Sequence, residues 1–358
     1  MNLRQLTGLL DEGSPLSSDR RTLIKRAAGL GLAIPVATML TESANAQNAV
    51  NTPPGSTIGS GGEQPGTGPS TPIPQTPTTF TPIDPFLQPV AAGPKQVTIT
   101  AKETTVFISK DVAYAGWSFD GTIPGPVHRL KVGDEVTVTV RNEAAMAHSL
   151  DSHAAQVPPN RDYPIVKPGE EYTWKFTPKH AGAFMYHCGT PPVLMHIASG
   201  MYGAMIVDPA EGWGPAQEIC LVQSEFYVTP GQNGGPMTPD FAKMMLSNGP
   251  MDYVTFNGYA NQYVENPIKV KVGEPIRIFV VNAGPNVWSS FHVVGAIFDA
   301  AYVNANPKNK FEGLQSISIG PGDGACVELT LEEPGSYAAV NHAFGHAQHG
   351  AIAILKAE

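Results

Sequence analysis

The chain has few charged residues, no basic excess and little helical periodicity. Charged side chains make up 15% of its 358 residues, and their balance gives a net charge of −9. A protein with this balance presents no basic face to nucleic acid. The abundant glycine (37 residues) and proline (34) favour a turn-rich β protein, and the length suits about two domains.

The N-terminal part is predicted to be a targeting signal that does not belong to the folded domains. Residues 1–46 carry Arg20-Arg21, which resembles a twin-arginine export signal, and end in a small-residue cleavage site at 44–46. The apolar stretch 27–40 is shorter than the ~20 residues that a membrane span needs. We therefore expect a periplasmic protein with no membrane span in its mature form. Residues 47–94 are rich in Pro, Gly, Ser and Thr and are predicted to be a flexible linker.

Beyond the linker the chain repeats itself. Residues 130–142 (LKVGDEVTVTVRN) match residues 270–282 (VKVGEPIRIFVVN), and both alternate apolar and polar side chains. This pattern predicts an all-β protein with two Greek-key β-sandwich domains in tandem, at residues 95–209 and 216–356. The best helix candidate is the short segment 240–246.

A thiolate, an imidazole and a thioether follow one another closely in the first repeat. Cys188, His196 and Met201 stand at Cys-x7-His-x4-Met spacing, and His148 lies about forty residues upstream. Two His, one Cys and a weak axial Met are the ligands of a blue-copper electron-transfer centre. These four residues are therefore the predicted ligands of one copper.

A second metal site is predicted beside the first. Neighbouring strand residues point to opposite faces, so His187 can bind another metal than Cys188 does. By the same alternation, Asp151 and His153 share a face while His148 takes the other. His153 and His187, with His342 of the second repeat, would give three imidazoles and an open position, as catalytic metal sites have.

Two further polar residues are candidates for proton delivery. We expect His292 to occupy the repeat position of His148 and, with no Cys nearby, to face the second metal site instead. Asp151 and His292 would then be a carboxylate and an imidazole beside an open metal position. The alternatives remain open: Asp151 can cap a turn, and His292 can be a buried core histidine.

Residues 97–355 resemble the copper-containing nitrite reductases, which are trimers of subunits with two cupredoxin domains. The motifs that carry the resemblance are His148-x2-Asp151-x-His153, Tyr186-His187-Cys188, 195–201 (MHIASGM), 290–295 (SFHVVG) and 340–342 (VNH). It implies a dissimilatory-type enzyme that reduces nitrite to nitric oxide and water by one electron.

The resemblance also assigns roles to single residues, with one type 1 and one type 2 copper per subunit. The implied type 1 copper ligands are His148, Cys188, His196 and Met201. The implied type 2 ligands are His153 and His187 of one subunit and His342 of the next, in a homotrimer. Asp151 and His292 match the catalytic pair, and Val294 matches an apolar residue over the substrate. The implied electron donor is a small cupredoxin or a c-type cytochrome.

Two other functions compete with this one. A laccase-like two-domain multicopper oxidase needs paired His-x-His ligands, yet the chain contains no His-x-His and Gly189 follows Cys188. A non-catalytic copper electron carrier would use the ligands around Cys188 and leave His153, His187 and His342 without purpose. The reductase is therefore favoured over both.

Several residues stay outside these predictions. His346 and His349 are expected to face solvent, while His128 and His180 are expected to be structural. Cys220 and Cys326 can form a disulfide in an exported protein or remain as two buried thiols.

Overall fold

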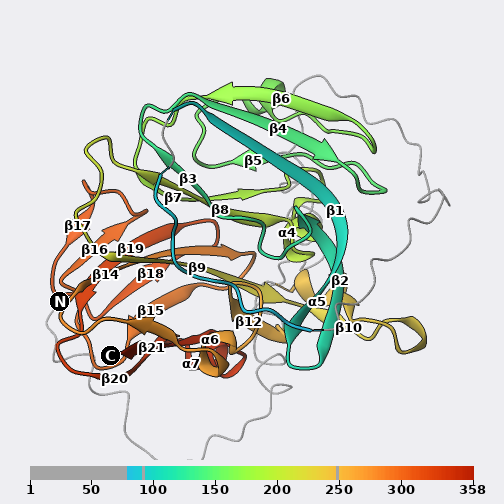
Figure 1. Cartoon of the computed structure of the whole chain (residues 1–358). Coiled ribbons are helices and arrows are strands. Elements are labelled where there is room, and N and C mark those ends of the chain that lie inside the picture. Colours follow the sequence, from blue (N-terminus) through green and yellow to red (C-terminus); the bar gives the residue numbers. More distant parts are fainter. Residues whose placement is uncertain (1–78, 91–92, 247–249) are drawn as a thin grey trace, which may run out of the picture. The chain divides into compact units, whose positions relative to one another are not determined.

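The computed structural model describes residues 79–90, 93–246 and 250–358, and all of them belong to one compact unit (Figure 1). The predicted export signal and most of the predicted linker lie outside the described residues. Within the described part, no helix is long and apolar enough to cross a membrane.

The first β-sandwich is built from two four-stranded sheets, ordered β2-β1-β4-β6 and β3-β8-β7-β5. Its strands are β1 (Lys95–Ser109), β2 (Val112–Phe119), β3 (His128–Lys131), β4 (Val136–Asn142), β5 (Asp151–Ser152), β6 (Glu171–Phe176), β7 (Gly182–His187) and β8 (Tyr202–Asp208). In β4 the side chains of Val136, Val138 and Val140 are buried while the residues between them are more exposed. This alternation is what the sequence pattern predicts for a strand that covers a core on one face.

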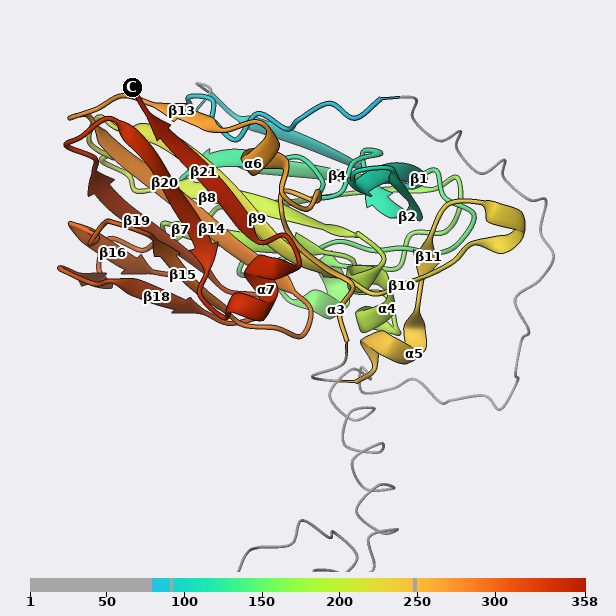
Figure 2. The same cartoon turned by 90° about the horizontal axis from the view of Figure 1, so that it is seen from below.

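The second β-sandwich contains a six-stranded sheet, β12-β9-β14-β19-β16-β17, and a five-stranded sheet, β13-β21-β20-β15-β18 (Figure 2). Its strands are β9 (Gln217–Phe226), β12 (Tyr253–Phe256), β13 (Ile268–Val270), β14 (Pro275–Gly284), β15 (Ser289–Val293), β16 (Ala300–Val303), β17 (Lys310–Phe311), β18 (Ser316–Ile319), β19 (Gly324–Thr330), β20 (Gly335–Asn341) and β21 (Ile352–Ala357). A small hairpin of β10 (Val228–Thr229) and β11 (Thr238–Pro239) forms a two-stranded sheet of its own, next to β2 of the first sandwich.

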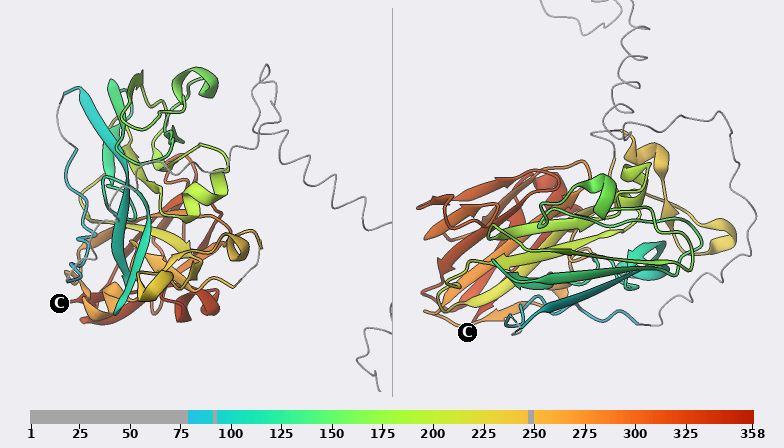
Figure 3. Two further views of the ribbon diagram at one scale, coloured as in Figure 1. Left: turned by 90° about the vertical axis from the view of Figure 1, so that its right-hand side faces the viewer. Right: turned by 90° about the horizontal axis from the view of Figure 1, so that it is seen from above.

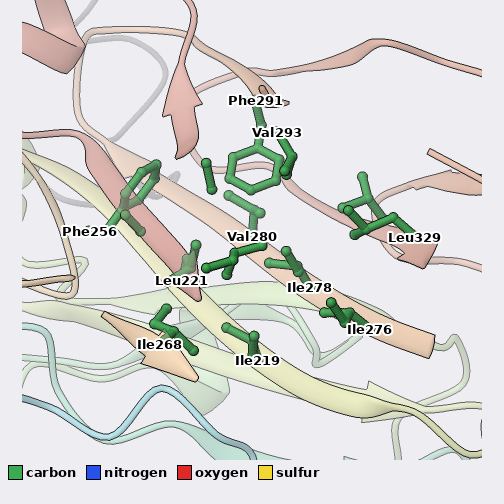
Figure 4. Packing of buried hydrophobic residues seen from close by; sticks show 14 of the residues in the cluster. Ile219, Leu221, Phe256, Ile268, Ile276, Ile278, Val280, Phe291, Val293 and Leu329 are labelled. Atoms are coloured by element: carbon green, nitrogen blue, oxygen red, sulfur yellow. The ribbon is translucent and has the colours of Figure 1, made fainter. Parts of the chain in front are cut away.

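The core of the second sandwich lies between its two sheets. Figure 4 shows Leu221 of β9 and Val280 of β14 directed toward Phe291 and Val293 of β15. All four side chains are fully buried. Burying a side chain of this size contributes about 1.5–3 kcal/mol to stability, so β9 and β14 are fixed by packing as well as by pairing.

The helices are short and lie in the connections. They are α3 (Pro159–Asp162), α4 (Val193–Ala198), η3 (Gln232–Gly234), α5 (Phe241–Met244), α6 (Gln262–Glu265) and α7 (Phe344–Gln348). The helix predicted at 240–246 is confirmed as α5, where the Asp240 side chain accepts a hydrogen bond from the Lys243 N–H. Helices α4 and α7 were not predicted from the sequence.

The two sandwiches are packed directly against each other. Strands β7 and β8 of the first contact β14 of the second, and β7 also contacts β19. Ala183 donates its N–H to the Asn304 carbonyl, and a Cβ added at Gly324 would lie 2.1 Å from the Ala183 carbonyl oxygen. Glycine is therefore required where β19 passes β7. Figure 3 shows the two sandwiches from two further sides.

The prediction of an all-β protein with paired sandwiches is confirmed, since only short helices interrupt the strands. The predicted boundaries at 95–209 and 216–356 stay a prediction, because the described residues form one compact unit.

Candidate metal centres

Strands β5 and β7 bring the predicted site residues of the first sandwich together. Asp151 pairs with His187 and Ser152 with Tyr186, and the His153 N–H donates to the Met185 carbonyl. His187 is the last residue of β7, so the chain leaves the sheet at Cys188. The side chains of His187 and Cys188 point into two different clusters, as the alternation of strand residues predicts.

The first cluster joins His148, Cys188 and His196. The Cys188 sulfur lies 3.3 Å from His196 Nδ1 and 3.8 Å from His148 Nδ1, and the two ring nitrogens are 3.1 Å apart. The three side chains are at most 3% exposed. The sequence predicted this grouping, and helix α4, which carries His196, supplies the turn that closes it.

Burial controls the protonation of this cluster. Desolvation lowers the pKa of His148 to about 3, with the neighbouring His196 as a second cause, and lowers the pKa of His196 to about 4. Desolvation also raises the pKa of the Cys188 thiol. The imidazoles are therefore neutral ligands at pH 7, and a bound cation would favour the thiolate.

The first cluster fits copper. Nδ1 of both imidazoles and the sulfur converge on one point, while His148 Nε2 is buried without a hydrogen-bond partner. The Ser149 N–H points at the Cys188 sulfur over 3.4 Å, a contact that stabilises a thiolate. Two imidazoles and one thiolate are the equatorial ligand set of a blue-copper centre.

Met201, the predicted axial ligand, is held next to this cluster by its backbone. Its carbonyl accepts the Cys188 N–H over 3.1 Å, its own N–H donates to the His196 carbonyl, and its side chain is 0% exposed. The role of its sulfur as a ligand stays a prediction. Sequence reasoning missed Trp117, whose ring centre lies 4.9 Å from that of His196. Nothing in its local sequence marks it.

The second cluster joins Asp151, His153 and His187. The Nε2 atoms of the two histidines are 3.1 Å apart, and the Asp151 Oδ2 atom lies 4.0 Å from His187 Nε2. His153 is exposed while His187 is buried, so the cluster opens to the surface on the side of His153.

The ring orientations in the second cluster fit a metal ion. His187 Nδ1 donates to the Cys188 carbonyl and His153 Nδ1 donates to the Gly322 carbonyl, which leaves an Nε2 lone pair on each ring. Burial lowers the pKa of His187, so its imidazole stays neutral. Two facing lone pairs at this distance repel each other unless a cation lies between them. Backbone carbonyls that hold the far nitrogen are typical of metal-binding histidines.

His342 and His292 lie together on the second sandwich, with ring centres 5.4 Å apart. His342 follows β20 and is exposed, and neither residue belongs to the clusters around Cys188 or His187 among the described residues. His292 Nδ1 donates to the Gln315 carbonyl, so the Nε2 atom of the same ring takes no part in this hydrogen bond. Val294 is 46% exposed next to β15.

The expected repeat position of His292 is wrong. His292 pairs with Val340 one residue before Asn341, as Asp151 pairs with His187 one residue before Cys188. His292 is therefore the counterpart of Asp151, and His148 corresponds to Ser289. The sequence misled because Ser289 carries no metal-ligand side chain, so the nearest histidine was matched instead.

Cys220 and Cys326 are two buried thiols, not a disulfide. Both pair with Phe279 of β14, one from β9 and one from β19, so a whole strand separates them. Two strand spacings amount to about 9–10 Å, which is beyond the reach of a disulfide.

The remaining histidines differ in environment. His180 and His349 are exposed, whereas His346 is half-buried and accepts a hydrogen bond from the Asn341 side chain. The expected solvent-facing position is therefore wrong for His346. His128 is half-buried with its Nε2 atom enclosed, and desolvation lowers its pKa to about 4, in agreement with a structural role.

Comparisons with known proteins find similarity to copper proteins. A multicopper oxidase family model matches residues 100–212. The copper-containing nitrite reductase of Neisseria meningitidis serogroup B is 37% identical over 269 residues, which are 74% of this chain and 68% of that protein.

Solved structures give the same picture. The copper nitrite reductase from Nitrosomonas europaea superimposes with a TM-score of 0.67 at 40% identity, over 74% of this chain and 93% of that one. A copper-containing nitrite reductase from Thermus scotoductus gives a TM-score of 0.68 at 34% identity, over 74% of this chain and 62% of that one.

Proposed function

The chain belongs to the copper-containing nitrite reductases, and on this premise we propose that it reduces nitrite to nitric oxide in the periplasm. The observation that carries the proposal is the pair of clusters on either side of one peptide bond. Cys188 belongs to a soft, buried cluster, and His187 belongs to a cluster that reaches the surface.

Each chain is proposed to hold one type 1 and one type 2 copper. The type 1 ligands are His148, Cys188, His196 and Met201; the type 2 ligands are His153, His187 and, from a neighbouring subunit, His342. The separation of His342 from the other two histidines within the chain supports its contribution across a subunit boundary. A homotrimer would close such boundaries into a ring.

Copper, when bound, stores one electron at the thiolate site and holds the oxyanion at the imidazole site. The net reaction consumes nitrite, one electron and two protons and gives nitric oxide and water. The electron comes from an external donor, for which we propose a small cupredoxin or a c-type cytochrome. The peptide unit between Cys188 and His187 is the shortest covalent path between the two clusters.

The protein supplies the protons. The Asp151 carboxyl lies 4.0 Å from His187 Nε2, close enough to hydrogen-bond an oxygen of nitrite held there and to give it a proton. His292 is proposed to supply the second proton from the neighbouring subunit, from Nε2 of its protonated ring, while Nδ1 donates to the Gln315 carbonyl. Val294 is proposed to cover the substrate with an apolar side chain.

The export route is proposed from residues 1–46, with Arg20-Arg21 as the twin-arginine signal. The oxidase alternative is weaker because the described residues hold two candidate metal clusters of three side chains, both already used here. A carrier would use only the cluster around Cys188.

The test is nitric oxide release from nitrite by the copper-loaded protein with a reduced artificial donor, without oxygen. Sustained release that disappears in His153→Ala, while the visible band of the thiolate site persists, supports the reductase and its site. Protein that holds two coppers per chain and releases no nitric oxide would contradict the proposal. His180→Gln, at an exposed position outside both clusters, is the control variant.

A further inference from the structure

Three hydrogen bonds frame the cluster around Cys188. The Ser149 N–H points at the Cys188 sulfur over 3.4 Å. The Cys188 N–H donates to the Met201 carbonyl, and the Met201 N–H donates to the His196 carbonyl, each over 3.1 Å. This frame fixes the relative positions of the thiol and of the two ligands that follow it in the chain.

The same three bonds recur in the second sandwich around Asn341. The Ser290 N–H donates to Asn341 Oδ1 over 3.1 Å. The Asn341 N–H donates to the Ala351 carbonyl, and the Ala351 N–H donates to the His346 carbonyl, each over 3.1 Å. Asn341 is thus the counterpart of Cys188, His346 of His196, and Ala351 of Met201.

The position of the fourth ligand is also matched. In the first sandwich, Asn142 donates from its side chain to the Val166 carbonyl, and Val166 forms a bridge with His148. In the second, Asn282 donates to the Ile319 carbonyl, and Ile319 pairs with Ser289. Ser289 therefore stands where His148 stands in the first sandwich.

Hydrogen bonds replace a metal inside this second frame. The Asn341 carboxamide, which is 0% exposed, donates from Nδ2 to His346 Nδ1 over 2.9 Å and lies 3.1 Å from the Trp288 carbonyl. The Ser289 hydroxyl is buried without a partner. Compared with the four predicted ligands of the first sandwich, one imidazole is kept as His346 and the thiol is replaced by the carboxamide of Asn341. The other imidazole and the thioether have no counterpart.

We propose that the second sandwich contains a degenerate metal site, formed by Ser289, Asn341, His346 and Ala351, in which the carboxamide of Asn341 takes the place of the thiolate and the ion. Restoring a thiol and one imidazole should give a site of two imidazoles and one thiolate, a set that selects copper. The segment from Asn341 to His346 spans five positions and that from Cys188 to His196 spans eight, so the restored site is tighter.

In the native chain the degenerate site has a structural use. Ser290, which donates to Asn341, also accepts the His342 N–H on its carbonyl over 2.7 Å. The carboxamide of Asn341 and the backbone of His342 are therefore held by the same residue of β15. His346 belongs to this hydrogen-bonded unit and is not a further copper ligand.

The experiment rebuilds the site in full-length protein. Cys188→Ser removes the thiolate of the first sandwich, and Ser289→His, Asn341→Cys and Ala351→Met are added to it. Copper(II) titration should give about one additional copper per chain and an intense thiolate-to-copper band in the visible range, which Cys188→Ser alone lacks. The control keeps Ser289 and carries the other three changes, which leaves the thiolate with a single imidazole, and should give neither.

A folded variant without the band, or with the same band in the control, would overturn the proposal. If the rebuilt variant fails to fold, the reciprocal change in the first sandwich tests the proposal instead. His148→Ser with Cys188→Asn should transplant the hydrogen-bonded unit onto His196 and unfold at a higher temperature, without metal, than His148→Ser with Cys188→Ala. Equal or lower stability of the asparagine variant would also contradict the proposal.

Discussion

His187 and Cys188 are consecutive residues whose side chains belong to different clusters. His187 Nε2 lies 3.1 Å from His153 Nε2, while the Cys188 sulfur lies 3.3 Å from His196 Nδ1. The His187 ring is held in addition by the carbonyl of Cys188. A displacement of either residue therefore changes both clusters, and the variants below separate their contributions.

Asp151→Asn should lower the rate of nitric oxide formation by about 10²-fold or more, because an amide cannot deliver the proton that a carboxyl can. The visible band of the thiolate site should be unchanged, since Asp151 lies outside that cluster. Steady-state kinetics and a visible spectrum on the same sample measure both. Turnover within twofold of the wild type would exclude Asp151 as the proton donor.

Cys188→Ser should remove the visible band and reduce bound copper from about two to about one per chain. The hydroxyl is a poor ligand for a soft ion, whereas His153 and His187 remain in place. Donor-driven turnover should be lost with the band. Metal analysis that still gives two coppers per chain would contradict the assignment of Cys188 as a ligand.

Mixed trimers test the shared site. Subunits with His153→Ala and subunits with His342→Ala should each be inactive alone. Co-assembled, they should regain part of the activity, because some boundaries then combine the native His153 of one subunit with the native His342 of the other. If all three ligands came from one chain, mixing would restore nothing. Separately prepared trimers mixed without exchange are the control.

His128 should make the stability of the protein depend on pH. Desolvation lowers its pKa in the folded protein to about 4. As the pH falls, the histidine therefore binds a proton near pH 6.5 in the unfolded chain but only near pH 4 in the folded chain. Stability from this source is complete above pH 6.5 and declines as the pH falls toward 4, by up to about 1.4 kcal/mol per pH unit.

Urea unfolding of wild type and His128→Gln at pH 7 and pH 5 measures this effect. The variant should lose less stability between the two values than the wild type does. His180→Gln changes an exposed histidine and should behave as the wild type. An unchanged pH dependence in His128→Gln would exclude His128 as its source.

The three cysteines should all be free thiols in the purified protein. Alkylation after denaturation without reductant should label three thiols per metal-free chain, and added reductant should not change the unfolding temperature. The strand β14 between Cys220 and Cys326 is the physical reason. Two labelled thiols fewer would show that these cysteines are oxidised.

Much of the first sandwich's site was predictable from the sequence. Ligand types and spacing marked Cys188 and His196, and the two-residue alternation of strands assigned Asp151 and His153 to the side of His187. These features are local, so the chain order alone carries them.

The rest depends on contacts between distant segments. The carbonyl of Gly322 that holds His153 and the indole of Trp117 beside His196 have no signature in the sequence. The repeat position of His292 was predicted wrongly because Ser289 and Asn341, which stand at the positions of His148 and Cys188, do not share their side-chain type.

The hydrogen bond from His153 to Gly322 crosses from the first sandwich to the turn before β19. The three side chains of the cluster around Cys188 therefore all come from the first sandwich, whereas the cluster around His187 depends on the second sandwich for the orientation of His153. A fragment that ended after β8 would retain His148, Cys188 and His196 but would leave the imidazole of His153 without its hydrogen bond to Gly322. In this architecture the orientation of His153 is a property of the two joined sandwiches.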